Sequence, residues 1–413
     1  MRMSLPKKRK GLLRTTALIL ATSFAATGCS SLSAIDNREP VSQGLSYQAE
    51  YRTPKDRGRH WDRSASSQNR SQCSDNGAAS LAHAPMNTAF TPDTVLLSAG
   101  DLVMVMVGSD ATFTGTHEIA QDGRLALPHL APIIALGRTT DSIERELGQA
   151  LVSQGYYDQP PRISVRLQDF APARVFVSGS VFEPGAVTIG GVSGADRDSI
   201  RQEALGATAE ARRLSRALQS AGGIRPDADL SSVRIRRGQK TIVVDARPAM
   251  LGRPYNDLIL LAGDHVDVGS RDCFQEELVK PTPVTTPGVK VFMSNLTQPA
   301  ASNANSAIGK EARELRYGTR FLEAIVGMNC MGGTKLVNAN RTAALISRNP
   351  VTGESIVIER RVEELLRSAD RDDFNPYMMP GDALACYDSG VTNVFDVARG
   401  MSSVAAAAAL LTL

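Results

Sequence analysis

Hydrophobic residues in the first ordered part of the chain follow two periods, and each period predicts a different element. Residues 102–107 (LVMVMV) are apolar throughout and rich in valine, which predicts a buried strand. Residues 162–168 alternate between polar and apolar side chains, which predicts a strand with one buried face and one wet face. An apolar side chain at every fourth position of residues 143–151 predicts a helix that begins near residues 140–141.

The same order of segments occurs twice in the C-terminal part of the chain. In each copy a strand leads to a helix that ends at two glycines, and short strands follow. The copies lie about 115 residues apart. Because each copy mixes a few strands with one helix, we expect an α+β fold and not a doubly wound parallel sheet. The paired segments are residues 175–178 and 291–294, 183–185 and 298–300, 222–223 and 332–333, 233–237 and 344–348, 242–244 and 356–358, and 261–266 and 379–384.

The N-terminus has the pattern of a secretory signal. Basic side chains within residues 2–14 precede an apolar run, and small residues follow it at positions 26–28. The run has about 10 residues, whereas a membrane-spanning helix needs about 20. The next residue is Cys29, and this arrangement resembles a bacterial lipoprotein signal, in which the cysteine is acylated and becomes the mature N-terminus. An ordinary signal peptide with a cysteine near its cleavage site is the alternative. In the lipoprotein family, an uncharged residue such as Ser30 accompanies sorting to the outer membrane.

Composition and charge are those of an ordinary globular protein. The chain has 413 residues, of which 42% are hydrophobic and 22% charged, enough for two or three domains. The net charge is only +3, and much of the basic excess lies in the signal and the segment after it, so no nucleic-acid partner is expected. Residues 29–90 are rich in Ser, Arg, Asn, Gln and Gly, which predicts a tether and an irregular arm.

The cysteines suggest disulfides and not a metal site. If Cys29 carries lipid, Cys73, Cys273, Cys330 and Cys386 remain, and an exported chain meets an oxidising compartment. Four cysteines allow three full pairings. Cys330 and Cys386 both fall within the second copy, so they are the preferred disulfide, with two buried free thiols as the alternative. No cysteine has the spacing of a zinc ligand.

No set of residues indicates catalysis, a cofactor or a metal. Asp101, Asp264 and Asp382 each follow a glycine at a turn, so we expect them to accept hydrogen bonds from backbone N–H groups. Residues 178–180 lead into a strand and not into a helix N-terminus, so they are not a phosphate loop. The histidines are scattered, without ligand spacing or a plausible nucleophile: His60, His83, His117, His129 and His265.

Residues 391–413 predict a C-terminal amphipathic helix. As a helix they would extend about 34 Å at about 1.5 Å per residue, which just spans a hydrocarbon core of about 30 Å. Polar groups within a membrane must be satisfied, so such a helix spans the bilayer only if several copies close a ring around water. The alternatives are a helix that packs on the second copy or lies at the membrane surface. The polar residues are Asn393, Asp396, Arg399, Ser402 and Ser403.

Taken in order, the segments resemble the outer-membrane polysaccharide export family, the auxiliary proteins of bacterial capsule and exopolysaccharide secretion. Residues 99–101 (AGD), 122–128 (DGRLALP) and 162–168 resemble its export domain, and the two later copies resemble its soluble-ligand-binding β-grasp modules. Three features depart from the family pattern: an insertion at residues 193–213, Asn295 where the first copy has Gly179, and a long linker at residues 300–316.

The resemblance implies six segments. They are a lipoprotein signal peptide (1–28), the arm (29–90), a polysaccharide export domain (91–172), a first β-grasp module (173–272), a second β-grasp module (289–388) and the C-terminal, possible membrane-spanning helix (391–413).

The resemblance also implies a function without catalysis. Members of the family form homo-oligomeric rings that are lipid-anchored to the outer membrane, with a periplasmic body and a pore lined by C-terminal helices. The translocated polysaccharide passes through the ring from an inner-membrane copolymerase, and no cofactor takes part. One alternative is a monomeric periplasmic lipoprotein that binds polysaccharide or a small ligand without a pore. The weakest alternative is an envelope glycan hydrolase, because no acid–base or nucleophile set is identifiable.

Overall fold

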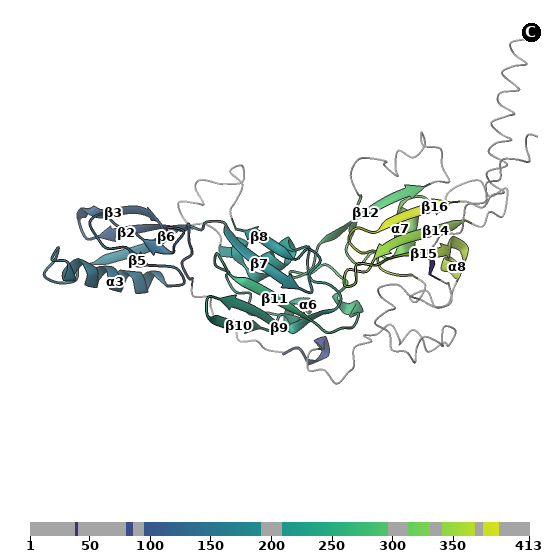
Figure 1. The fold of residues 1–413 in the computed structure, drawn as a ribbon, viewed down its shortest axis with the longest axis horizontal. Coiled ribbons are helices and arrows are strands. Elements are labelled where there is room, and N and C mark those ends of the chain that lie inside the picture. The colour runs from purple at the N-terminus through teal and green to yellow at the C-terminus, as the bar shows by residue number, and fades with distance from the viewer. Residues whose placement is uncertain are drawn as a thin grey trace, which may run out of the picture.

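The computed structural model describes residues 80–85, 95–190, 209–295, 313–330, 341–367 and 375–387, and the backbone of residues 38–39. Within these ranges the chain forms three units in a row (Figure 1), each built on its own sheet and core. We call them the N-terminal unit (residues 95–169), the first repeat (173–270) and the second repeat (288–387). Sheets with few helices confirm the α+β class.

The N-terminal unit is an antiparallel sheet of order β3-β2-β6 covered by one helix. The helix α3 begins at Thr140, as predicted, but Thr139 is the N-cap, and its side chain accepts a hydrogen bond from Ser142 N. The predicted apolar stripe of this helix is fully buried. The elements are β2 (Leu102–Val107), β3 (Asp110–Glu118), β4 (Arg124–Leu125), β5 (Ile133–Ile134), α3 (Thr140–Ser153) and β6 (Ile163–Asp169).

The first repeat is a five-stranded sheet of order β10-β9-β11-β7-β8. Strands β7 and β11 pair in parallel, and the other pairs are antiparallel. The elements are β7 (Ala173–Gly179), β8 (Gly185–Ile189), the 3-10 turn η3 (Ala209–Arg212), α5 (Leu214–Ser220), β9 (Ala228–Arg237), β10 (Lys240–Val244), α6 (Arg247–Met250) and β11 (His265–Ser270).

The second repeat has the same strand order, β15-β14-β16-β12-β13, again with one parallel pair, β12 and β16. Each helix also occupies the same place in the chain order as its counterpart. The elements are β12 (Gly288–Asn295), β13 (Arg313–Arg316), α7 (Phe321–Gly327), β14 (Thr342–Arg348), β15 (Ser355–Arg361), α8 (Val362–Arg367) and β16 (Ala383–Tyr387). The 3-10 turn η4 (Glu276–Leu278) lies between the repeats.

The strand registers correct part of the sequence alignment between the copies. Ile235 faces Val266 and Leu345 faces Leu384 across the central strands, so Ile235 is equivalent to Leu345 and not to Ile346. The alignment was therefore wrong by one residue at residues 344–348, and by two at residues 356–358, where Ile358 is equivalent to Ile242. Short apolar strands slip easily in a comparison of sequences, whereas a one-residue slip in a sheet exchanges its faces.

Two short pieces of the predicted arm are ordered against the repeats. Strand β1 (Arg38–Glu39) pairs in parallel with β15, whose edge offers unpaired backbone groups. The 3-10 turn η2 (Leu81–His83) buries Leu81 in the core of the first repeat, because this apolar side chain leaves water there. The arm thus has at least two attachment points that its polar composition did not indicate.

The three Gly-Asp turns confirm the structural role expected of their carboxylates. In each turn the Asp side chain accepts a hydrogen bond, 2.7–2.9 Å long, from the backbone N–H three residues earlier. Each carboxylate is also buried. The donor–acceptor pairs are Ser98 and Asp101, Leu261 and Asp264, and Met379 and Asp382.

Asp101 also links the N-terminal unit to the first repeat. Arg212 Nη1 lies 2.7 Å from Asp101 Oδ1, and both side chains are completely buried. The same oxygen accepts a 2.9 Å hydrogen bond from Ala171 N, in the segment that joins the two units. Burial raises the pKa of Asp101, and the charge of Arg212 opposes this shift. The pair is therefore an interdomain contact whose members need each other.

The sequence around Arg212 is adapted to enclose its guanidinium. Nε donates to Leu260 O at 3.2 Å, and the guanidinium lies 5.2 Å from the centre of the Phe170 ring. Gly190 has φ +78°, and a Cβ there would lie 2.7 Å from Arg212 Cγ. Glycine thus suits this position both for its backbone conformation and for the close approach of the arginine stem.

The two repeats meet through a smaller set of contacts. Tyr317 of the second repeat is buried and makes an edge-to-face contact with Phe182, with ring centroids 6.2 Å apart. Arg320 pairs with Glu276 of η4 and donates to Tyr377 Oη at 2.8 Å. These contacts attach the connecting segment to the second repeat.

Removal of Arg212 is expected to destabilise the protein far more than removal of an exposed arginine. The change Arg212→Met leaves Asp101 buried without its cation, which costs about 3–5 kcal/mol. The matched control is Arg124→Met, because Arg124 and Asp122 form an ion pair with side chains 51% and 63% exposed, worth about 0–1 kcal/mol. Urea titration of the full chain measures the free energy of unfolding. If both variants lose the same free energy of unfolding, the importance of the interdomain pair is refuted.

Asp382 is expected to make the second repeat less stable as the pH rises. Burial raises the pKa of this carboxyl to about 7, from an ordinary value of 3.8. The folded state therefore keeps a proton that the unfolded chain releases, so stability falls between these two pH values, by roughly 1.4 kcal/mol per pH unit. The variant Asp382→Asn stays neutral, so its thermal stability relative to the wild type should rise with pH. Asp264→Asn is the control, because Asp264 pairs with Arg237. Parallel pH profiles of the wild type and Asp382→Asn would contradict this account.

Candidate functional site

Several residues singled out in the sequence lie outside the described residues. These are Cys29 and the five polar positions of the predicted C-terminal helix, Asn393, Asp396, Arg399, Ser402 and Ser403. In the part of the chain that the structure describes, none of the helices combines the length and the hydropathy required to cross a bilayer. Lipidation and the C-terminal helix therefore stay predictions.

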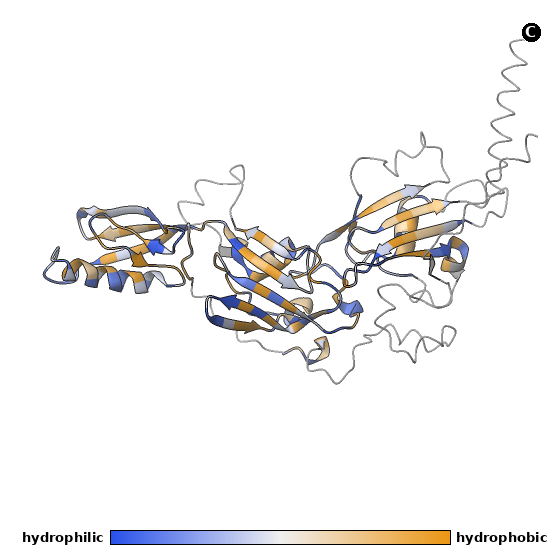
Figure 2. Ribbon diagram, viewed as in Figure 1, coloured by the Kyte–Doolittle hydropathy of each residue, from blue (hydrophilic) through white to orange (hydrophobic). Residues whose placement is uncertain are grey.

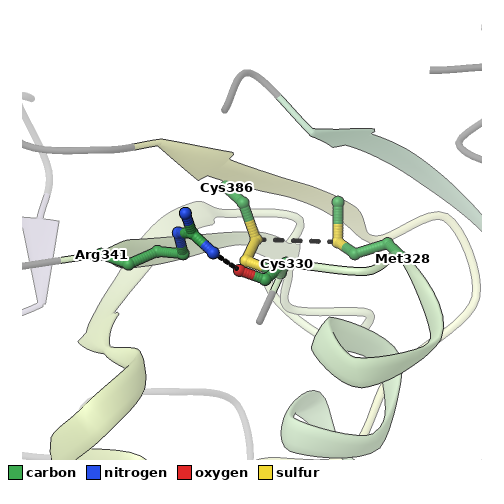
Figure 3. The surroundings of a disulfide bond; sticks show 4 residues. All are labelled: Met328, Cys330, Arg341 and Cys386. Atoms are coloured by element: carbon green, nitrogen blue, oxygen red, sulfur yellow. Dashed lines mark hydrogen bonds between the residues drawn. A yellow bond between two sulfur atoms is a disulfide. The ribbon is translucent and has the colours of Figure 1, made fainter. Parts of the chain in front are cut away.

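Cys330 and Cys386, the preferred pair, are joined by a disulfide in the structure, with Cα atoms 6.1 Å apart (Figure 3). The bond connects the turn after α7 to β16, across a sequence separation of 56 residues. Both cysteines are fully buried, and the sulfur of Met328 lies 3.8 Å from Cys386 Sγ. Arg341 Nη1 donates a 2.6 Å hydrogen bond to Cys330 O. The bond thus crosses the core of the second repeat.

Metal-binding side chains do not converge in the described ranges. No group of three His, Cys, Asp or Glu side chains there is placed to hold a metal ion. His117 lies on β3 of the N-terminal unit, and burial lowers its pKa. His265 lies on β11 of the first repeat. The structure does not bring these two histidines into one site.

A hollow of about 670 Å³ lies along α3 in the N-terminal unit. Arg138 lies in this hollow, but its guanidinium pairs with Glu146 and donates to Ser142 Oγ. It also donates to Ile134 O. These bonds join the segment before the helix to the helix itself, so we assign Arg138 a structural role.

The best candidate for a binding site is the open face of the first repeat. Residues along β7 alternate, so that Ala173, Val175 and Val177 are buried whereas Arg174 and Phe176 are exposed. Helix α5 contacts β7 and β8, and its apolar side chains share the core with the buried residues. Among the described elements, no helix covers the opposite face of the sheet, on which Phe176 is exposed. Figure 2 shows the corresponding alternation of hydrophilic and hydrophobic residues along β9 and β10.

Phe176 and His265 form a two-ring platform on this face. Their rings are stacked, with centroids 4.7 Å apart and planes inclined by 16°. They are direct neighbours across the parallel strands β7 and β11. The Phe176 side chain is 38% exposed, and the Arg174 guanidinium lies 5.9 Å from its centre. The platform offers a ligand flat apolar surface beside a positive charge.

A carboxylate fixed by two neighbours lies next to the platform. Asp267 Oδ2 accepts a 2.7 Å hydrogen bond from Arg234 Nη2, and Oδ1 accepts a 3.0 Å bond from Ser178 Oγ. The Arg234 hydrogen bonds hold the pKa of Asp267 below its ordinary value. The group is therefore an ionised acceptor in a defined orientation.

Next to this group is Arg236, for which the described part of the chain provides no hydrogen-bond or ion-pair partner. It faces His265 on one neighbouring strand and Thr241 on the other. These groups surround a hollow of about 310 Å³, at the small end of ligand pockets, which measure about 300–1,000 Å³. The lining residues are Ser178, Arg234, Arg236, Thr241, His265 and Asp267.

The equivalent face of the second repeat has a different chemistry. A row of four neighbouring residues crosses each sheet. In the first repeat the row is Phe176, His265, Arg236 and Thr241, and in the second repeat the residues at the same positions are Phe292, Ala383, Ile346 and Val357. Phe292 and Ile346 are 58% and 44% exposed. The aromatic position is thus shared, but the cation and the imidazole of the first repeat are replaced by aliphatic side chains.

Sequence reasoning missed the site on the open face. Its side chains come from strands that are far apart in the chain, and in the sequence His265 has no plausible nucleophile and no second histidine at ligand spacing. One usable signal was present: the exposed positions of residues 233–237 (VRIRR) carry arginines, whereas those of the second copy do not.

The comparison with a family model agrees with the architecture of the N-terminal unit. Residues 90–168 match the model of the polysaccharide biosynthesis/export protein family. This range contains the whole sheet and α3 apart from the last residue of β6.

A curated relative gives a similar result. The chain is 26% identical over 196 residues to the EPS I polysaccharide export outer membrane protein EpsA of Ralstonia solanacearum. The alignment covers 45% of this chain and 46% of EpsA, so it spans about half the length of each protein. Residues 90–168 are thus similar to the polysaccharide biosynthesis/export protein family, and about half of the chain is similar to one of its export proteins.

Proposed function

We propose that the protein is a subunit of an outer-membrane conduit that exports capsular or extracellular polysaccharide from the periplasm to the cell surface. The observation that carries this proposal is the family domain at residues 90–168, which a buried ion pair attaches to the first repeat. The relative EpsA is named as an outer-membrane polysaccharide export protein. The proposed role is passage of the polymer and not its chemical modification.

Two segments would connect the protein to the membrane, the lipidated N-terminus and residues 391–413, and both lie close to the second repeat in the chain or in the sheet. Cys29 precedes Arg38 by nine residues, and such a segment spans at most about 30 Å. Because Arg38 pairs with Val357 on β15, a lipid on Cys29 would hold this repeat close to the outer membrane. Residues 391–413 follow soon after β16 of the same repeat. The N-terminal unit, at the other end of the row (Figure 1), would then point into the periplasm, towards an inner-membrane copolymerase.

A ring of identical subunits would account for the polar side of the C-terminal segment. Asn393, Asp396 and Arg399 recur at three-residue spacing, so in a helix they gather on one side. A single copy would expose these groups to lipid, whereas a closed ring directs them to a water-filled pore. We therefore assign residues 391–413 to the pore.

A second candidate function is a periplasmic lipoprotein that binds polysaccharide without forming a pore. The exposed polar residues on the open face of the first repeat favour it. Conductance across planar bilayers and calorimetry with the exported polysaccharide separate the two candidates. Conductance supports the conduit, and solution binding by a monomer without conductance supports the binding protein.

Deletion of residues 391–413 is expected to abolish surface polysaccharide while the two repeats stay folded. The deletion removes the proposed pore helix and leaves all described residues intact. Quantification of surface polysaccharide in cells and particle images of the detergent-extracted protein check this prediction. A control deletion within residues 300–312 of the long linker should leave the pore in place. Normal export by the protein without residues 391–413 would refute the conduit.

Loss of the lipid is expected to weaken membrane assembly more than folding. The variant Cys29→Ser, exported behind a signal that is not lipidated, keeps every described contact but lacks the acyl anchor. The fraction of rings inserted in the outer membrane should fall, whereas the thermal unfolding temperature should not change. Ser31→Ala, behind the natural signal, keeps the anchor and all cysteines and serves as the control for ring insertion. Normal ring assembly by Cys29→Ser would reduce the lipid to a sorting signal.

A further inference from the structure

We propose that the open face of the first repeat binds an acidic sugar unit of the polysaccharide, and that the second repeat lacks this site. The proposal rests on the function proposed above, and it adds the chemistry of the substrate and the residues that contact it. The residues are the platform of Phe176 and His265, the cation Arg236 and the fixed carboxylate of Asp267.

The platform suits the shape of a sugar ring. One face of a pyranose carries mainly C–H groups, and it packs against the flat surface of an aromatic side chain. Phe176 offers such a surface, because it lies on the solvent side of the sheet with 38% of its area exposed. Stacking with His265 fixes the orientation of the ring, so little conformational entropy remains to be lost when a ligand binds.

The polar groups beside the platform suit a carboxylated sugar. Three arginines, Arg174, Arg234 and Arg236, share the open face with the carboxylate of Asp267, so this part of the face is rich in cations. Arg234 is already engaged with Asp267, and Arg174 lies against Phe176. Arg236, without a partner in the described part of the chain, is therefore the group available to a ligand carboxylate, to which an arginine donates two parallel hydrogen bonds. Asp267 and Thr241 remain as acceptors for sugar hydroxyl groups.

The open shape of the site suits a chain and not a free sugar. The hollow lies on the surface of a sheet, between exposed side chains of β7, β9, β10 and β11. A polymer lies across such a surface without the need to insert an end. Contacts with one sugar unit at a time also permit release, which a conduit requires.

The second repeat provides an internal control for this assignment. Its sheet has the same order and retains the aromatic residue as Phe292, which is 58% exposed. The positions of His265, Arg236 and Asp267 are occupied by Ala383, Ile346 and Ala385. The cation, the imidazole and the carboxylate next to the aromatic residue of the first repeat therefore have no counterparts at these three positions.

The proposal is tested by calorimetry, which measures the affinity of the full-length lipoprotein for two probes. The probes are oligogalacturonate and its methyl ester, at equal chain length. The two probes share their rings and differ in charge. Oligogalacturonate should bind at least about tenfold more tightly than the ester, because a hydrogen bond to a charged group is worth about 1.5–3 kcal/mol. Arg236→Gln should remove about tenfold of the affinity for the acid and leave the affinity for the ester unchanged. Phe176→Ala should weaken the binding of both probes.

Phe292→Ala is the matched control and should bind both probes as the wild type does. All three side chains are exposed, so unchanged thermal unfolding temperatures will show that the variants are folded. Equal affinity for acid and ester, no binding of the acid, or an equal loss in Phe292→Ala would each overturn the proposal.

A separate measurement distinguishes failure of the site from failure of the proposed function. If deletion of the whole gene abolishes surface polysaccharide but oligogalacturonate does not bind, the site is refuted and the export function stands. If the deletion leaves surface polysaccharide intact, the export function itself is refuted.

Discussion

The buried ion pair of Asp101 and Arg212 is the contact on which the arrangement of the N-terminal part depends. The carboxylate of Asp101 accepts hydrogen bonds from Ser98 N in its own turn and from Ala171 N in the connecting segment. It also pairs with the guanidinium of Arg212 in the first repeat. Neither charge is exposed to water, so each would be strongly unfavourable without the other. This cost is a reason to regard the N-terminal unit and the first repeat as one body, with a fixed direction between them.

The same Gly-Asp turn is used three times, and its second partner differs each time. Asp101 pairs with an arginine of another unit, and Asp264 pairs with Arg237 of its own sheet. Within the described residues, the second partner of Asp382 is the hydroxyl group of Ser347. The backbone task of the carboxylate is conserved within the chain, because the turn needs an acceptor. The charge is available for a second purpose, and without a cation it becomes a group whose pKa lies near neutrality.

The two repeats show how one sheet supports two surfaces. Their buried faces must remain apolar, since each packs on a helix and forms a core. Their outward faces carry no such requirement, and there the chemistry differs, from His265 and Arg236 in one repeat to Ala383 and Ile346 in the other. A repeat that keeps its core and changes its open face gains a new contact surface without a new fold. In this protein the stacked aromatic pair with an arginine and a held carboxylate beside it occurs on the first repeat, whereas aliphatic side chains occupy the equivalent positions of the second.

Local patterns in the sequence were sufficient for the fold class and for several of its elements. The period of four at residues 143–151, the apolar run at 102–107 and the glycine that precedes each of the three aspartates determine a helix, a strand and three turns by interactions within a few residues. The register between strands and the partner of Arg212, by contrast, depend on contacts between residues far apart in the chain. Arg212 lies at the end of a segment that resembled an insertion, and its partner is 111 residues away. The open face of the first repeat likewise joins residues of four strands. Only the tertiary structure decides such neighbours, because sequence periodicity indicates which side of a strand a residue occupies but not what lies across from it.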